Sequence, residues 1–224
     1  MLQHALKRLS KMPHHLPRLY PIIDAAHFAA LRDPISAINA FAEELLLGGV
    51  TLIQYRNKSA NMRQMLSQAR ELRRTTLDRA KLIMNDRTDL CLAAGFDGVH
   101  LGQDDLSPAA ARQIFRAAGQ ERLQIGYSTH NLQQLQEADQ LPVDYIAIGP
   151  VFATASKANP DPVIGLEGVR VARKATGKPL VAIGGITRRN CREVFAAGAD
   201  SVAVISDLVE SPRKSTEEFL LILG

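Results

Sequence analysis

The stretch TLIQYRNKS, residues 51–59, holds the pattern that decides the fold of this chain. It opens with the apolar segment 51–53 and then turns polar. Side chains of an extended chain alternate between two faces, so Gln54, Arg56 and Lys58 point in one direction. The stretch therefore predicts a buried strand that presents one amide and two cations at its carboxyl end.

Apolar runs of this kind recur along the whole chain. Each is short, nearly continuous and rich in β-branched residues, as expected for strands that are buried on both faces. We expect strands at 18–23, 50–55, 81–85, 97–101, 122–128, 143–149, 179–185 and 200–206.

The segments between these runs carry apolar residues at helical spacing. They predict helices at 34–47, 61–79, 107–118, 131–139, 164–176 and 188–197. A further helix is expected to open at Asp86, and Ser215 with Glu218 predicts a capping box before a closing helix.

Strands that alternate with helices eight times in 224 residues predict an α/β fold, a single (β/α)8 TIM barrel. A doubly wound open sheet is the alternative, but no glycine-rich dinucleotide motif follows the first run. We expect residues 1–17, which are basic and broken by Pro13 and Pro17, to form an N-terminal extension, and residues 18–224 to form the barrel.

The composition narrows the class of protein. Hydrophobic residues make up 46% and charged residues 22%, which is ordinary for a globular chain. The net charge of +4 suits an anionic ligand, but no basic run with interleaved aromatics predicts nucleic-acid binding. No stretch approaches the roughly 18 apolar residues of a membrane span. Cys91 and Cys191 lack metal-ligand spacing and suit a reducing cytosol, so we expect a cytoplasmic protein.

Polar residues follow almost every predicted strand, and the carboxyl ends of barrel strands meet at one rim where barrel enzymes do their chemistry. The cations and hydroxyls there predict phosphate binding, with Arg56 as a forked donor and Lys58 and Lys157 as point charges. Asp86 and Asp105 predict a Mg²⁺ site, with a helix N-cap as the alternative for Asp86.

Gly184 and Gly185 precede ITRRN at a strand–helix transition, where backbone can approach a second phosphate. His100 and His130 are candidates for acid–base work, but we favour a supporting role through hydrogen bonds. The residues alone therefore predict a barrel enzyme that handles a diphosphate, Mg²⁺ and a second phosphate. They do not name the reaction.

Six motifs occur in order: QYRNK, NDRTDLCLAAGFDGVHLGQDD, IGYSTH, DYIAIGPVFATASK, VAIGGITRRN and AGADSVAVIS. From Leu19 to Asp207 the chain resembles the thiamine-phosphate synthase family. The resemblance implies a TIM barrel that joins 4-amino-5-hydroxymethyl-2-methylpyrimidine diphosphate to a thiazole phosphate, giving thiamine phosphate and pyrophosphate.

The resemblance also implies roles for individual residues. The pyrimidine diphosphate would be held by Gln54, Arg56, Lys58, Asn85 and Lys157, with Ser128 near the pyrimidine. Mg²⁺ would be carried by Asp86 and Asp105, and we prefer Asp105 to Asp104 as the second ligand. The thiazole phosphate would be bound by Thr154, Gly185, Ile205 and Ser206. Ser156 stands where Thr is common, which keeps the hydroxyl.

We take Arg56, Lys58, Lys157 and Ser128 as the catalytic side chains. The expected partners are the two small-molecule substrates, and apolar barrel helices often pair, which suggests a homodimer. The loop 153–162 is long enough to act as a lid.

Three other functions are alternatives to this one. A thiazole tautomerase of the same fold tends to carry His at the position of Pro150. A non-catalytic thiamine-phosphate-binding homologue would show decay of the charged rim. A different phosphate-binding barrel, such as a ribulose-phosphate epimerase, is disfavoured by the presence of NDR together with GQDD.

Overall fold

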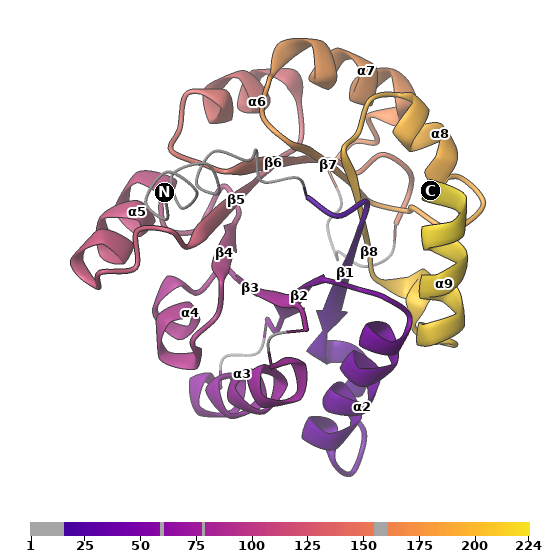
Figure 1. Ribbon diagram of the computed structural model, residues 1–224. Helices are drawn as coiled ribbons and strands as arrows, with labels where there is room; N and C mark the ends of the chain where they lie inside the picture. Colours follow the sequence, from indigo (N-terminus) through magenta and orange to yellow (C-terminus); the bar gives the residue numbers. More distant parts are fainter. Residues whose placement is uncertain (1–15, 59–60, 78, 155–160) are drawn as a thin grey trace, which may run out of the picture.

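The computed structural model describes residues 16–58, 61–77, 79–154 and 161–224, and these form a closed barrel of eight parallel strands. The strands pair in chain order, and β1 pairs with β8 to close the ring, as Figure 1 shows. The predicted TIM barrel is thus confirmed, and the open sheet is excluded because an open sheet leaves two unpaired edges.

The strands lie within a few residues of their predicted positions. Their bounds are β1 Leu19–Asp24, β2 Leu52–Arg56, β3 Lys81–Asn85, β4 Gly98–Leu101, β5 Gln124–Thr129, β6 Tyr145–Ile148, β7 Leu180–Ile183 and β8 Ser201–Val204. Strands β2 to β8 end in or are followed by the residues singled out in the sequence, so those residues share one rim.

The helices lie outside the ring of strands in Figure 1. Their bounds are η1 Ala25–Phe28, α2 Pro34–Leu47, α3 Met62–Thr76, α4 Thr88–Ala94, α5 Pro108–Ala117, α6 Leu132–Asp139, α7 Gly165–Ala175, α8 Cys191–Ala196, η2 Ser206–Leu208 and α9 Pro212–Leu223. Helix α9 contacts both α8 and α2 and so closes the outer layer.

Two predicted helix starts are wrong. Helix α4 is capped at Arg87, because Asp86 takes a left-handed backbone conformation with φ 64° and turns the chain before the helix begins. Helix α9 begins at Pro212, whose restricted φ suits the first helical position. Ser215 therefore lies inside the helix, with its N–H on the carbonyl of Ser211 at 2.8 Å, and forms no capping box.

The apolar core has two layers. An outer layer fills the space between strands and helices. An inner layer fills the inside of the barrel and includes Tyr20, Leu52, Tyr145 and Val181. Leu16, just before β1, is buried in this inner layer. Gly126 makes room for the Tyr145 ring, because a Cβ there would lie 2.1 Å from Cζ of Tyr145.

A pattern of Arg–Asp pairs repeats at the amino ends of the strands. In each case an aspartate just before an even-numbered strand accepts two kinds of hydrogen bond. One comes from the backbone N–H of a residue at the start of the preceding strand, and the other comes from an arginine of the helix that leads into that preceding strand. The pairs are Asp97 with Leu82 N–H and Arg73, Asp144 with Ile125 N–H and Arg112, and Asp200 with Leu180 N–H and Arg173. These pairs lie at the end of the barrel that barrel enzymes use for stability. No helix of the described segments is long and apolar enough to cross a membrane.

Candidate active site

A cavity of about 440 Å³ opens at the carboxyl ends of the strands. It is lined by every predicted site residue that the structure describes: Gln54, Arg56, Lys58, Asn85, Asp86, Asp105, Ser128, Thr154, Gly185, Ile205 and Ser206. Ser156, Lys157 and most of the expected lid 153–162 lie outside the described residues. The closed ring explains the convergence, since all eight strand ends face one space.

The two described cations of the site each meet a carboxylate. Arg56 donates from Nη1 to Asp24, which ends β1 and was not picked out in the sequence. Lys58 donates from Nζ to Asp86, which follows β3. Both carboxylates are mostly covered, whereas the Lys58 side chain is 55% exposed and is therefore accessible to a ligand.

Asp86 and Asp105 form a carboxylate pair. Burial raises the pKa of Asp86 above its ordinary value, and the nearby carboxylate of Asp105 raises it further while Lys58 lowers it. Asp105 is held by the N–H of Gly102, which donates to Oδ2 at 2.7 Å. Two half-buried carboxylates that repel one another form a site at which a cation would be favourable.

The donor set fits Mg²⁺, which commonly binds one or two carboxylates together with waters and phosphate oxygens. Within the described segments no cluster of three or more His, Cys, Asp or Glu side chains is placed to hold a metal ion. The Asp86–Asp105 pair would thus supply two ligands and need the rest from water and substrate. Asn85 lies beside the pair, and its buried Nδ2 has no hydrogen-bond partner in the described part of the chain, which leaves a donor for an anion.

A hydrogen-bonded chain of side chains crosses the floor of the cavity. Gln54 Nε2 donates to the Tyr20 hydroxyl at 3.2 Å, and the Tyr20 and Tyr145 hydroxyls are 2.9 Å apart. The Tyr145 hydroxyl lies 3.1 Å from Nδ1 of His100, whose Nε2 lies 2.8 Å from Oγ of Ser128. The chain thus joins Gln54 to Ser128 through three buried residues.

Counting protons shows how the two ends are coupled. Burial raises the pKa of both tyrosines and lowers the pKa of His100 to about 4, so each of these three carries one proton near neutral pH. The three buried residues supply three protons, but the chain has four hydrogen bonds. One of the two end residues, Gln54 or Ser128, must therefore donate the fourth proton, and the other must accept. When Gln54 donates inward, Ser128 accepts from His100 and keeps its hydroxyl proton for the cavity. When Ser128 donates to His100 instead, Gln54 accepts from Tyr20 and turns its amide N–H towards the cavity. In either arrangement the two end residues present one donor and one acceptor to the cavity.

The opposite side of the cavity is lined by residues that follow β7 and β8, two of them glycines. Gly184 and Gly185 have φ of 100° and 62°, and a Cβ on Gly185 would lie 2.5 Å from the carbonyl oxygen of Ala153. Only glycine fits such a conformation and approach. Helix α8 begins later than predicted, at Cys191, so the glycines line the cavity and the helix terminus does not.

Both histidines make hydrogen bonds of the kind expected for a supporting role. His100 belongs to the chain on the cavity floor, and His130 places Nδ1 at 2.8 Å from the carbonyl oxygen of Gly149. His130 also lies 3.4 Å from the Asp161 carboxylate, which joins the end of β5 to the segment before α7.

Three contributors were missed in the sequence. Asp24 ends the first apolar run, so the rule applied to the other strands would have found it. Tyr20 and Tyr145 carry no such signal, because both read as core residues of buried strands. Their hydroxyls become functional candidates only through contacts across the closed barrel.

Residues 19–208 match the family model described as thiamine monophosphate synthase. The chain belongs to the thiamine-phosphate synthase family. It is 58% identical to the thiamine-phosphate synthase of Koribacter versatilis (strain Ellin345) over 208 residues, which cover 93% of this chain and 96% of that protein. It is 42% identical to the thiamine-phosphate synthase of Chloroflexus aurantiacus, with 86% and 85% covered.

A solved member of the thiamine-phosphate synthase family has the same fold. The thiamine phosphate pyrophosphorylase from Pyrococcus furiosus is similar to this chain with a TM-score of 0.78 at 36% identity, covering 92% of this chain and 95% of that one. The resemblance seen in the motifs is thereby confirmed, and with it a transferase of thiamine biosynthesis. The roles of individual residues stay predictions.

Proposed function

We propose that this protein joins an aminopyrimidine diphosphate to a thiazole phosphate, releasing pyrophosphate and forming thiamine phosphate. The observation that carries the proposal is the division of one cavity into two sides. Cations and carboxylates stand at β2, β3 and β4, whereas glycine and serine backbone stands at β7 and β8. The ring places β3 opposite β7, so a diphosphate and a second phosphate can be held facing one another.

The diphosphate side is built to stabilise a leaving group. Pyrophosphate departure places negative charge on oxygen, and fixed cations that meet this charge lower the barrier. Arg56 and Lys58 are those cations, with Asn85 as a neutral donor beside them. Lys157, which precedes α7 in the sequence, is proposed as a third. The carboxylates Asp24 and Asp86 hold the two described cations in place before substrate arrives.

Asp86 and Asp105 are proposed to hold Mg²⁺. When bound, the ion would neutralise charge on the diphosphate as the bond to carbon breaks. Without the ion, Lys58 would offset part of the repulsion between the Asp86 and Asp105 carboxylates.

The chain on the cavity floor suits the pyrimidine. The edge of a 4-aminopyrimidine offers one donor, the amino group, next to one acceptor, the ring nitrogen. Gln54 and Ser128 together offer one acceptor and one donor, so they can pair with both positions. This pairing would orient the ring so that the carbon bearing the diphosphate faces the second substrate.

The second substrate needs little activation. A thiazole nitrogen is already a nucleophile, so no activated serine or cysteine is required, and holding the two reactants close supplies much of the rate. Thr154, Gly185, Ile205 and Ser206 are proposed to bind its phosphate, with Ser156 adding a hydroxyl. Two buried free thiols, Cys91 and Cys191, favour a reducing compartment such as the cytoplasm, and a homodimer stays a prediction.

The decisive assay mixes purified protein with Mg²⁺ and both substrates and measures pyrophosphate release. We expect release that needs both substrates and stops on chelation. Release from the pyrimidine diphosphate alone would indicate hydrolysis instead. No release from folded protein would overturn the proposal. Turnover of a thiazole carboxylate alone would then indicate the tautomerase, and tight thiamine-phosphate binding without turnover would indicate a binding protein.

A further inference from the structure

The backbone side of the cavity consists of two segments that are far apart in sequence. Gly184–Ile186 follows β7 and Ile205–Ser206 follows β8, and both line the cavity. A tetrahedral anion bound by backbone N–H groups from two segments requires a set spacing between them, because hydrogen bonds weaken steeply with distance and angle. What holds the two segments together lies behind the cavity wall.

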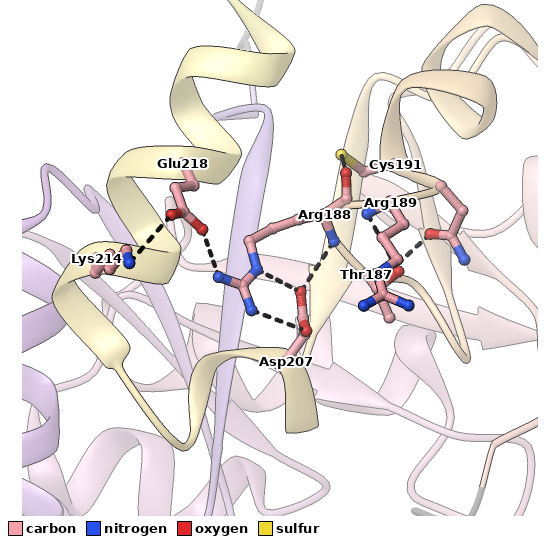
Figure 2. Close-up of polar contacts among 8 residues, drawn as sticks. Thr187, Arg188, Arg189, Cys191, Asp207, Lys214 and Glu218 are labelled. Carbon is pink, nitrogen blue, oxygen red and sulfur yellow. Dashed lines mark hydrogen bonds and ion pairs between the residues drawn. The ribbon is translucent and has the colours of Figure 1, made fainter.

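Arg188 joins these segments. It lies three residues after Gly185, and it binds Asp207, which directly follows Ser206. Its backbone N–H and its Nε each donate to Asp207 Oδ2 at 2.9 Å, and its Nη2 donates to Oδ1 at 3.3 Å. Both carboxylate oxygens of Asp207 are thus engaged by one residue. Figure 2 shows the Arg188 side chain lying between Asp207 and helix α9.

The same guanidinium is tied to the outer layer. Arg188 Nη1 donates to Glu218 of α9, and Lys214 lies 3.9 Å from the other Glu218 oxygen (Figure 2). The Asp207 side chain is 20% exposed and the Arg188 side chain 33%, so the pair is partly shielded from solvent. A planar guanidinium with several fixed donors sets geometry in a way that a lysine cannot.

A second side chain braces the glycine segment. Asn190 donates from Nδ2 to the carbonyl oxygen of Gly185 at 3.0 Å and accepts the N–H of Thr187 at 2.8 Å. The segment that contains Arg188 is therefore itself tied to Gly185. Displacement of Arg188 would thus be transmitted to the residue that lines the cavity.

Arg188, Asp207 and Glu218 are not among the residues that line the cavity in the described part of the chain. We propose that the Arg188–Asp207 pair is a positioning device that sets the spacing of the Gly185 and Ser206 segments and thereby governs affinity for the phosphate of the thiazole substrate. The inference rests on the proposed function, which assigns that phosphate to this side. The pair touches no substrate and acts through the backbone that it holds.

The test compares Arg188→Met with Arg173→Met. Arg173 is a matched control, because it also binds an aspartate, Asp200, at 2.7 Å, but at the amino ends of the same two strands. Arg188→Met should raise KM for the thiazole phosphate by roughly tenfold, since a displacement of about 1 Å can cost on the order of a hundredfold. KM for the pyrimidine diphosphate should stay unchanged. Arg173→Met should lower Tm and leave both KM values unchanged.

A binding measurement separates this inference from the proposed function. Calorimetry with the thiazole phosphate and with the thiazole alcohol measures what the phosphate adds to affinity, and it needs no turnover. In Arg188→Met the ratio of the two affinities should fall towards one, and Arg188→Lys should restore it only in part. An unchanged ratio, or an equal fall in Arg173→Met, would overturn the inference. Absence of pyrophosphate release from the unaltered protein would instead count against the proposed function.

Discussion

The hydroxyl of Tyr145 is the central link of the chain on the cavity floor, so Tyr145→Phe tests the coupling of Gln54 to Ser128. The change removes two hydrogen bonds, to Tyr20 at 2.9 Å and to His100 at 3.1 Å. Both partners are buried and keep one other hydrogen bond each, to Gln54 and to Ser128, but each is left with one unsatisfied donor or acceptor, which costs about 1–3 kcal/mol. We expect a loss of about 2–6 kcal/mol in the free energy of unfolding, or roughly 4–24 °C in Tm for a domain of this size.

The kinetic effect of Tyr145→Phe should fall on one substrate. Without the central hydroxyl, Gln54 and Ser128 no longer need to present opposite hydrogen-bonding groups, so arrangements with two donors or two acceptors become populated. KM for the pyrimidine diphosphate should therefore rise, and KM for the thiazole phosphate should not. Thermal unfolding by circular dichroism and steady-state pyrophosphate release measure the two effects.

Tyr55→Phe is the matched control. Tyr55 is also buried and its hydroxyl donates to Gln68 of α3 at 2.5 Å, but it lies in the outer core layer rather than in the cavity. The control should lose stability without a change in either KM. The reasoning is refuted if Tyr145→Phe leaves Tm and the pyrimidine diphosphate KM unchanged, or if both variants raise that KM equally.

Three further outcomes are expected. Burial raises the pKa of the Cys91 thiol to about 12, so iodoacetamide at pH 8 should label it only after unfolding, and rapid labelling of the native protein, seen by mass spectrometry, would contradict its burial. Burial lowers the pKa of His100 from 6.5 to about 4, so between these pH values the unfolded chain binds a proton that the folded chain does not. Urea unfolding should therefore show the free energy of unfolding falling by about 3 kcal/mol as the pH drops through this window. His100→Gln should reduce this dependence of stability on pH. Asp105→Asn should weaken the Mg²⁺ dependence of pyrophosphate release and Asp104→Asn should not; the reverse result would assign the metal to Asp104.

Much of the site could be read from the chain because strand periodicity is local. Alternation of side chains in β2 places Gln54, Arg56 and Lys58 on one face whatever the rest of the fold does. Once eight runs predict a barrel, the rule that chemistry lies at the strand ends brings Asn85, Ser128 and the glycines to the same rim. These predictions needed only short-range sequence patterns and one topological rule.

Local detail was harder to predict where two conformations compete. Asp86 is a good N-cap residue by type, yet it adopts φ 64° and leaves the cap to Arg87. Asp tolerates the left-handed region better than most residues. Its carboxylate meets Lys58 and Asp105, contacts that involve residues 28 and 19 positions away and that no helix-start pattern reports.

The amino-acid sequence by itself determined the barrel, the polar rim and the family, because each depends on residue type and spacing along the chain. Only the tertiary structure decided the pairing of Arg56 with Asp24, the hydroxyl contact between Tyr20 and Tyr145, and the tie of Arg188 to Asp207. Such contacts depend on strand register and on closure of the ring, which bring together residues separated by 32, 125 and 19 positions. The strength of a hydrogen bond depends on distance and angle between atoms, and neither is specified by the local sequence around either partner.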